Sequence, residues 1–586
     1  MRDAKSDQTE EAMPYRAPAA EFRFLFQHVV DLGPVRATLR FADATADLTD
    51  AILNEAARLC DEVLAPLQRV GDQHPARLEN GVVRTSPGYG EAYRAIAGGG
   101  WVGMTASPDH GGMGLPMVLA FAVNEMMAGA CLALQLNPLM TQGQIEALEH
   151  HASPELQGIY LPKLISGEWS GTMNLTEPQA GSDVGALRCK AEPLGDGSHA
   201  ITGQKIFITW GDNDFTANVC HLVLARLPDG AAGTKGISLF MVPKYLPDAA
   251  GNPGQANSLH VVSLEHKLGL HGSPTAVMQY DGATGWLVGA PHQGMKAMFT
   301  MMNNARLGVG GQGIGVAEAA YQHAAAFAAD RRQGKPPEGR GDSILGHADV
   351  RRMLATMKAE LFAARAIALS CAAATDMARA TGDADWQAKA DWQARAAFLT
   401  PIAKACGTDT GISVADIGIQ VHGGMGYIEE TGAAQFLRDV RVTSIYEGTN
   451  GIQAIDLVGR KLADGGDMAG RLLDEVQAGA EAARPAMADL AGLVWNSAEA
   501  MRDATEAMIA METNDRNAGA TAYLRAFARV LGGHFHLKAA LADRVARAAL
   551  AEFYIRRLLP DHASLLVQAR AGAAGLYALT DDQLAP

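Results

Sequence analysis

A single acidic residue, Glu447, lies in a mostly apolar stretch at residues 442–458, which reads VTSIYEGTNGIQAIDLV. Carboxylates are rarely buried unless they are needed there, because an unpaired buried charge is costly. A carboxylate in a dry pocket has a raised pKa and is a stronger base, so general-base chemistry is one interpretation. A solvated turn residue is the other, and this stretch alone does not decide between them.

A loop rich in hydroxyl groups is the second candidate. Residues 173–191 read MNLTEPQAGSDVGALRCKA, and Ser, Thr and Gly crowd the stretch at the edge of a predicted sheet. Hydroxyls and free backbone N–H groups suit a phosphate or the edge of a heteroaromatic ring. An ordinary turn between two strands is an equally good interpretation.

Two further stretches carry aromatic residues or glycines. In residues 203–212, GQKIFITWGD, Phe207 and Trp210 flank Thr209 and form either a wall for a flat cofactor or, more commonly, core packing. In residues 420–427, QVHGGMGY, the glycines allow close approach of a ligand, although a helix C-cap explains them equally well. This glycine cluster does not follow a strand, so a Rossmann dinucleotide fold is rejected.

The surrounding elements must position these stretches. Helical apolar spacing precedes residue 165, period-two runs such as HAITGQKIFITW and NVCHLVLARL follow, and helical patterns return after Trp286. The period-two runs predict antiparallel strands, with Asp281–Gly282 as a turn. The sequence thus predicts an α+β fold: an N-terminal helical domain (1–165), a middle β domain (166–285), a helical bundle with Glu447 (286–465) and an additional helical domain (466–586).

Composition excludes several classes of function. The formal net charge of -15 argues against nucleic-acid binding, which needs a basic field. The six cysteines show no metal-site spacing and are expected to be reduced core thiols. The polar N-terminus has no signal-peptide pattern, and no uncharged apolar run of membrane-spanning length is expected. We therefore expect a cytoplasmic protein with no metal, no nucleic-acid partner and no stable membrane insertion.

Each of these stretches is ambiguous alone, but five motifs in this order are specific. They are TEPQAGSD, GQKIFIT, RLGVGGQGIGVAEAAY, QVHGGMGY and IYEGTNGIQ. With them the chain resembles the acyl-CoA dehydrogenase family of flavoproteins across residues 45–462. The resemblance implies a helical domain, a β domain and a four-helix bundle, with FAD as cofactor. YRAPAAEFRFLFQHVVDL near the start and the extra helical C-terminus resemble a long subgroup that includes 3-methylmercaptopropionyl-CoA dehydrogenase.

The resemblance implies a role for Glu447 as the base that removes the α-proton of an acyl-CoA thioester while a hydride leaves Cβ for the flavin. The backbone N–H of Glu447 and a ribityl hydroxyl of FAD would stabilise the enolate oxygen. Gly448 would leave room for substrate, and Arg306 would contact the CoA moiety. Ala305 occupies the position where some members carry their base instead, so Glu447 is the expected base.

The same resemblance implies the FAD contacts, with Ser182 also at the substrate phosphopantetheine. They are Thr176, Ser182, Phe207, Thr209, Arg331, Gln420, Gly423, Gly424 and Thr449. Phe207 stands where many members have Trp, the ERxxFG-like match at Arg331 is loose, and Gly451 replaces a common Gln that contacts adenine.

The implied reaction is FAD-dependent α,β-dehydrogenation to the trans-2-enoyl-CoA. The expected substrate is 3-methylmercaptopropionyl-CoA, of dimethylsulfoniopropionate (DMSP) degradation, or a short- to medium-chain acyl-CoA. The resemblance also implies an electron-transfer flavoprotein as acceptor and a homodimer, since the FAD site is shared between subunits. An acyl-CoA oxidase, a dehydrogenase of longer fatty acyl-CoAs and a scaffold without activity stay open. Rapid reoxidation by air would identify the oxidase, and a colourless protein that cannot take up FAD would identify the scaffold.

Overall fold

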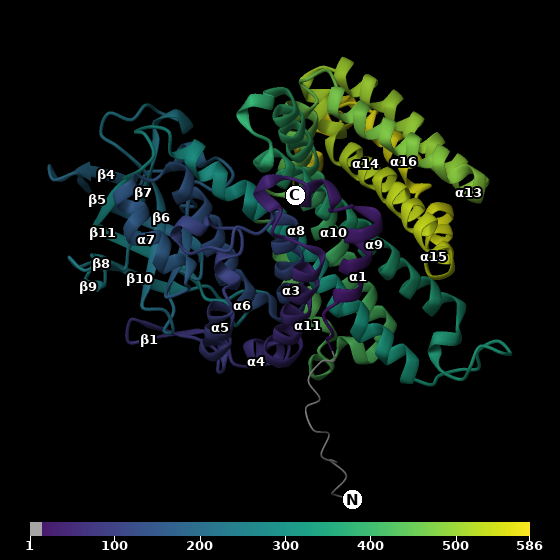
Figure 1. Cartoon of the computed structure of the whole chain (residues 1–586), viewed down its shortest axis with the longest axis horizontal. Coiled ribbons are helices and arrows are strands. Elements are labelled where there is room, and N and C mark those ends of the chain that lie inside the picture. The colour runs from purple at the N-terminus through teal and green to yellow at the C-terminus, as the bar shows by residue number, and fades with distance from the viewer. Residues whose placement is uncertain (1–14, 586) are drawn as a thin grey trace, which may run out of the picture. The chain divides into compact units, whose positions relative to one another are not determined.

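The computed structural model describes residues 15–585, which fold into two compact units (Figure 1). The first unit contains residues 15–17, 55–116 and 126–305, and the second contains residues 18–54, 117–125 and 306–585. Helices α3 (Ala46–Leu59), α6 (Met117–His151) and α8 (Gly294–Asp330) contribute residues to both. The bounds of the four predicted domains stay predictions.

The first unit is built around a seven-stranded sheet. Its strands are β3 (Trp169–Asn174), β4 (Lys190–Pro193), β5 (Ser198–Thr209), β6 (Asn218–Arg226), β7 (Ile237–Pro243), β10 (Leu259–Leu264) and β11 (Thr275–Val288). They follow the order β10-β11-β5-β4-β6-β3, and β7 pairs with both β11 and β6, so that five of the strands close a ring. The prediction of an antiparallel sheet holds for most pairs, but β3 and β4 run parallel to β6.

Burial explains the two kinds of strand pattern in this sheet. β5 is buried at Ser198, Ile201, Lys205 and Ile208, with half-buried or exposed residues between them, so only part of its surface faces the core. β7 is buried along its whole length, which is why its sequence ISLFMVP is apolar without alternation. Phe240, Val242, Ile201 and Tyr280 meet in the core that these strands enclose.

The sequence was misread at two places in this unit. Asp281–Gly282 is not a turn but a bulge inside β11, where the register with β5 shifts and Gly282 has φ of 77°. A short hairpin of β1 (Arg77–Glu79) and β2 (Val82–Arg84) lies in the segment predicted to be helical. Its Asn80–Gly81 turn is a strong hairpin marker that the helical interpretation overlooked.

Helices complete the first unit: α4 (Leu67–Gln73), α5 (Tyr89–Gly98), α7 (Pro154–Ile165) and the larger part of α6. A further two-stranded piece pairs β8 (Tyr245–Pro247) with β9 (Pro253–Ala256). Ser153 precedes α7 as its N-cap, and its side chain accepts a hydrogen bond from the backbone N–H of Leu156.

The second unit is a helical bundle. Its long helices are α8, α9 (Ala348–Ala380) and α10 (Trp386–His422), and the shorter α11 (Ala433–Val440) and α12 (Asn450–Asp456) follow them in the chain. Glycines let α8 and α10 approach closely, because a Cβ on Gly313 would lie 2.4 Å from the carbonyl oxygen of Gly407. This approach explains the small-residue sequence RLGVGGQGIG.

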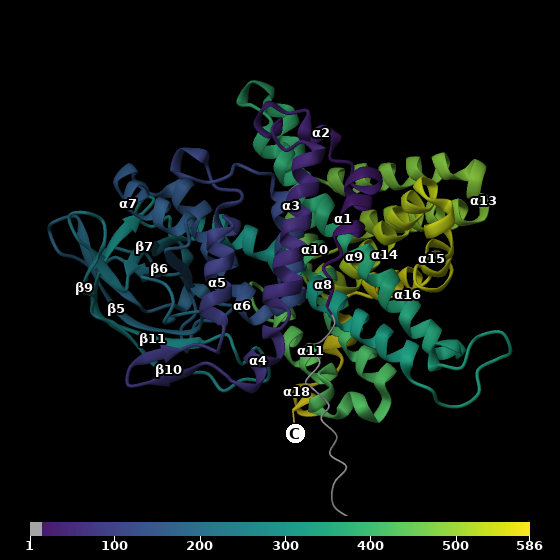
Figure 2. The same ribbon diagram turned by 60° about the horizontal axis from the view of Figure 1, so that its bottom comes forward.

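The additional helical segment packs on this bundle. Its helices are α13 (Asp467–Ala510), α14 (Thr513–Ala542), α15 (Arg544–Arg557) and α16 (Asp561–Ala569), which lie together in yellow-green to yellow in Figure 2. α14 contacts α9, α10 and α12. His536 of α14 bonds the carbonyl oxygen of Ala359, and Arg529 pairs with Glu360. The sequence left open what this segment covers, and the structure assigns it to the bundle.

Two sets of buried charges link distant segments of the second unit. Arg365 of α9 bonds both Glu125 and Glu318, and these three side chains are almost fully buried. Asp376 accepts hydrogen bonds from the first two backbone N–H groups of α6, at 2.6 and 2.9 Å. Burial raises the pKa of Asp376 to about 7, against the effect of those hydrogen bonds.

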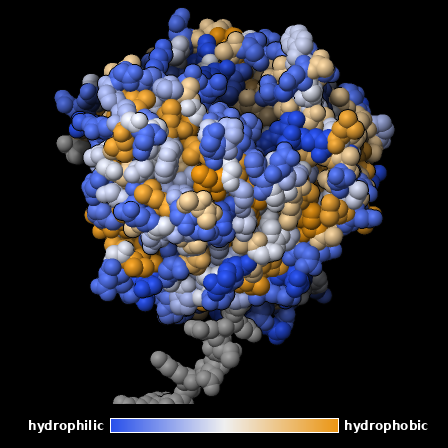
Figure 3. Space-filling model, turned by 60° about the vertical axis from the view of Figure 1, so that its left-hand side comes forward, coloured by the Kyte–Doolittle hydropathy of each residue, from blue (hydrophilic) through white to orange (hydrophobic). Residues whose placement is uncertain are grey.

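Within residues 15–585, two helices are long and apolar enough, by length and composition alone, to cross a membrane. They are α6 and α9, and their most apolar windows are 100% and 83% buried in the protein. Burial of this kind is typical of core helices, so the two windows are weak evidence for insertion. On the face drawn in Figure 3, apolar residues are scattered among polar ones.

Candidate active site

Glu447 lies in the loop between α11 and α12, in a conformation that few residues adopt. Its φ is 56°, and Gly448 follows at 83°. A non-glycine residue held in this region stores strain, which is common at functional sites. Glu447 is partly exposed as a residue, but its Oε2 atom is buried and has no hydrogen-bond partner among the described residues.

The surroundings of Glu447 suit a general base. Burial raises the pKa of its carboxyl group to about 7, while the positive charges of Arg306 and Lys404 act in the opposite direction. A carboxyl group that titrates near neutrality can both accept a proton efficiently and be present in its charged form. An unpaired buried carboxylate oxygen is thereby available to a substrate proton.

Hydrogen bonds on both sides hold this loop. Gln453 donates from Nε2 to the carbonyl oxygen of Glu447 at 3.2 Å. Thr449 caps α12 by accepting from the backbone N–H of Ile452, and Asn450 bonds three residues of α10. A Cβ on Gly448 would lie 2.6 Å from Nε2 of Gln453, so a larger residue would have to displace that side chain in addition to adopting a positive φ.

A buried ion pair supports the TEPQAGSD loop of the first unit. Lys205 Nζ lies 2.8 Å from Glu177 Oε1, and both side chains are buried. Glu177 also accepts hydrogen bonds from the backbone N–H groups of Arg188 and Cys189. Thr176 is half-buried and Ser182 is exposed in this loop, and their predicted contacts with FAD stay predictions.

Phe207 and Trp210 have different surroundings. Phe207, near the end of β5, has φ of 59° and a side chain that is 58% exposed. Trp210 is fully buried and donates from its indole N–H to the carbonyl oxygen of Ala133, so it is a core residue. Half-buried Thr209 lies between them. An exposed aromatic ring beside a hydroxyl group fits a flat cofactor.

The glycine loop of the second unit is open. Gly423 is the C-cap of α10, with φ of 60°, so the helix-cap interpretation is confirmed. No atom lies within 4 Å of a Cβ built on Gly423 or Gly424, and Gln420 is exposed at the same helix end. This open backbone is compatible with the predicted FAD contact.

The two predicted arginines differ in burial. Arg331 is exposed just after α8 ends, whereas Arg306, on α8, is buried and acts electrostatically on Glu447 and Asp456. The predicted contacts of Arg306 with CoA and of Arg331 with FAD stay predictions.

Sequence reasoning missed two supports of the site, Lys404 and the Lys205–Glu177 pair. Lys404 was visible as one cation in the small apolar stretch TPIAKACG, a position where an unpaired charge would be costly. Glu177 and Lys205 each lie within a recognised motif, but nothing in the sequence indicates that they pair.

A carboxyl group with a raised pKa, an exposed aromatic ring and an open glycine backbone are each compatible with a flavin-dependent dehydrogenase. Models of the acyl-CoA dehydrogenase family match most of the described chain. The N-terminal domain matches residues 47–168, the middle domain 172–283 and the C-terminal domain 292–463. The additional segment matches the acetyl-CoA dehydrogenase C-terminal-like domain at 472–580. The chain belongs to the acyl-CoA dehydrogenase family, whose members use FAD.

Individual relatives support membership of this family. The chain is 47% identical over 470 residues to 3-methylmercaptopropionyl-CoA dehydrogenase of Ruegeria pomeroyi, covering 80% of this chain and 79% of the relative. It is 34% identical to a butyryl-CoA dehydrogenase of Syntrophomonas wolfei, covering 76% and 75%. Among solved structures, Caenorhabditis elegans ACDH-11 in complex with C11-CoA has a TM-score of 0.78 at 18% identity, covering 95% of this chain and 93% of its own.

A structure from Bacillus anthracis, an acyl-CoA dehydrogenase complexed with FAD, has a TM-score of 0.73 at 20% identity, covering 93% and 91%. Likeness at these identities shows the fold. Together with the family match, the comparisons confirm the predicted α+β fold, FAD as cofactor and acyl-CoA dehydrogenation as the activity.

Proposed function

We propose that this chain oxidises 3-methylmercaptopropionyl-CoA, with Glu447 as the base. The observation that supports the substrate is the 47% identity to the Ruegeria pomeroyi enzyme over most of both chains. The lower identity, 34%, to a butyryl-CoA dehydrogenase keeps a plain short-chain acyl-CoA as the second candidate.

The proposed chemistry uses the residues described above. The buried Oε2 of Glu447 takes the proton from Cα of the thioester, and the backbone N–H of Glu447 donates to the thioester oxygen as negative charge develops there. Bound FAD supplies a two-electron acceptor for the hydride from Cβ. Arg306 and Lys404 keep Glu447 partly ionised near neutral pH, because their positive charges oppose the effect of burial.

The cofactor contacts are also proposals. Phe207 and Thr209 would hold the flavin ring, with Thr176, Ser182 and Thr449 near it. Gln420, Gly423, Gly424 and Arg331 would contact the FAD of a second copy. We therefore propose a homodimer, an electron-transfer flavoprotein as acceptor and a cytoplasmic location. The six free cysteines support a reducing compartment.

A panel of acyl-CoAs tests the substrate. The protein reconstituted with FAD is assayed with an artificial electron acceptor and 3-methylmercaptopropionyl-, butyryl-, hexanoyl- and palmitoyl-CoA. We expect the highest kcat/KM for the methylthio thioester. A higher value for butyryl-CoA or for palmitoyl-CoA would contradict the proposal. Stopped-flow reoxidation by air separates a dehydrogenase, which we expect to react slowly, from an oxidase.

The assembly is tested separately by sedimentation. We expect a species of twice the chain mass or larger, and a monomer that retains FAD would contradict the shared site.

A further inference from the structure

Asn450 connects the loop of the base to two other parts of the second unit. It is the first residue of α12, three positions after Glu447. Its Oδ1 accepts a hydrogen bond from Lys404 Nζ at 2.9 Å, and its Nδ2 donates to Thr408 Oγ1 at 3.0 Å and to Asp409 Oδ1 at 2.7 Å. All three partners belong to α10, so one side chain fixes the start of α12 to the bundle.

Asp409 extends this connection to the additional helical segment. Its second oxygen, Oδ2, lies 3.2 Å from both Nε and Nη2 of Arg525, on α14. α12 itself packs against both α10 and α14. Residues 466–586 thus reach the helix that follows the base by packing and by an ion pair.

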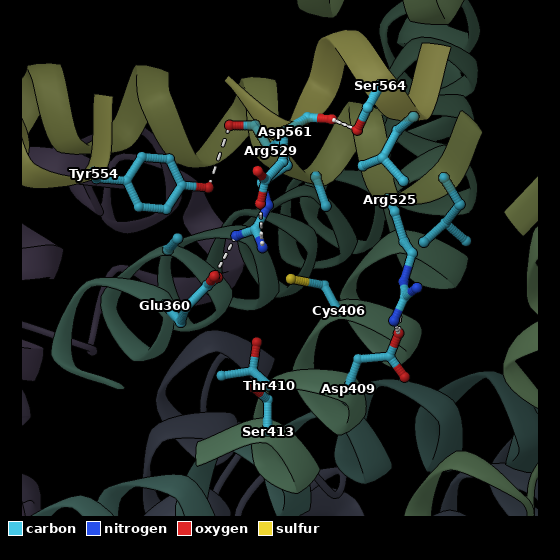
Figure 4. Close-up of a pocket in the computed structure, with 14 residues that line it drawn as sticks. Glu360, Cys406, Asp409, Thr410, Ser413, Arg525, Arg529, Tyr554, Asp561 and Ser564 are labelled. Carbon is cyan, nitrogen blue, oxygen red and sulfur yellow. Dashed lines mark hydrogen bonds and ion pairs between the residues drawn. The ribbon is translucent and has the colours of Figure 1, made fainter. Parts of the chain in front are cut away.

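A cavity of about 340 Å³ lies beside this ion pair (Figure 4). Its wall includes Asp409, Arg525, Arg529 and Glu360, and each of the two arginines is already paired with a carboxylate. The cavity leaves the Arg525–Asp409 pair partly solvated, with side chains 55% and 34% exposed. The pair alone is therefore a modest support, whereas the hydrogen bonds of Asn450 are the principal one.

We propose that Asn450 is a positioning residue for Glu447, and that Arg525 of the additional helical segment supports it through Asp409. The inference rests on the proposed role of Glu447 as the base. Asn450 acts in two ways: it holds the strained loop in which Glu447 has positive φ, and it keeps the ammonium group of Lys404 directed to an amide oxygen. Without Asn450, Lys404 would be free to turn toward Glu447, whose charge already acts on it and whose Oε2 atom is buried without a hydrogen-bond partner among the described residues.

The charged groups around the base determine what should be measured. Arg306 from α8 and Lys404 from α10 face Glu447, and Asp409 acts on Lys404. Asp456 and Arg460 act on Arg306. If Lys404 turns toward Glu447, the carboxylate becomes easier to form, so the acidic limb of the pH–rate profile should move to lower pH while the rate falls.

The test uses Asn450→Ala, Arg525→Gln and the double variant as holoenzymes, with the rate of flavin reduction by acyl-CoA measured per bound FAD across pH 5.5–9. We expect Asn450→Ala to reduce this rate roughly 10- to 100-fold, as misplacement of a catalytic group does. We expect Arg525→Gln to reduce it about two- to fivefold, the range of a partly exposed ion pair.

The controls separate positioning from general stability. Arg525→Lys should restore most of the rate, and Arg484→Gln, which removes an exposed ion pair within α13, should leave it unchanged. In the Asn450→Ala background, Arg525→Gln should reduce the rate little further, because Arg525 is proposed to act on the base only through Asp409 and Asn450.

The proposal is overturned if Asn450→Ala retains the wild-type rate and pH profile, if it loses only FAD content or thermal stability, or if the two effects multiply independently. Failure of the proposed function would look different, because Glu447→Gln would then retain turnover.

Discussion

Replacing Glu447 by Gln should make the protein inactive and, above neutral pH, more stable. The carboxyl group has a pKa of about 7 in the folded protein, where its usual value is 4.5, because burial disfavours its charge. In the unfolded chain the group ionises at lower pH. The folded state therefore loses stability as pH rises from about 4.5 to about 7, and the loss persists above that.

The size of the effect follows from the pKa difference. A difference between about 7 and 4.5 corresponds to roughly 3 kcal/mol of unfavourable free energy at high pH. Glutamine has nearly the same shape and no charge, so Glu447→Gln should recover most of this above pH 8. At pH 5, Glu447 is largely protonated when folded but mostly ionised when unfolded, so the difference should shrink to about 1 kcal/mol and vanish only below pH 4.5.

Thermal unfolding of the FAD-bound proteins at fixed scan rate, from pH 5 to pH 8.5, measures the prediction. The apparent Tm of the variant should exceed that of the wild type at pH 8.5, and the gap should close on acidification. Turnover should fall about 10²–10⁴-fold or more, with FAD retained. Glu55→Gln is the control, because Glu55 is an exposed carboxylate paired with Arg58 and should show no gain at high pH.

Two results would refute this reasoning. A stability gap that is the same at every pH would mean that the charge of Glu447 is not its cause. Wild-type turnover by the variant would mean that Glu447 is not the base.

Three other perturbations test the exposed aromatic ring of Phe207 and two buried carboxylates of the fold. Phe207→Ala should weaken FAD binding about 2- to 10-fold, the value of one aromatic contact, measured by flavin release on dilution, and unchanged affinity would remove Phe207 from the flavin wall. Lys205→Met should destabilise the protein by about 3–5 kcal/mol in chemical unfolding because buried Glu177 loses its partner, and a second change, Glu177→Gln, should restore part of the loss. Asp376→Ala should cost about 2 kcal/mol in the same assay because two backbone N–H groups at the start of α6 lose their acceptor, whereas no change would mean that water replaces it.

Local pattern was sufficient for much of the fold. The short, mostly apolar run of β7 and the long run of small apolar residues in α8 differ in length and composition, so a strand and a helix could be assigned from them. The exceptions were short segments whose backbone structure the spacing of apolar residues does not determine. Asp281–Gly282 has the composition of a turn, yet pairing of β11 with β5 continues through it as a bulge.

The sequence by itself determined the family, the cofactor and the identity of the expected base, because five ordered motifs carry that information. It could not determine what surrounds Glu447, since Lys404 and Arg306 are distant in the chain and their charges act only once α8, α10 and the loop are packed together. The place of the additional helical segment was likewise decided only by tertiary structure. Its attachment depends on ion pairs and packing between residues more than a hundred positions apart, such as Arg525 and Asp409, and no periodic pattern encodes such a pairing.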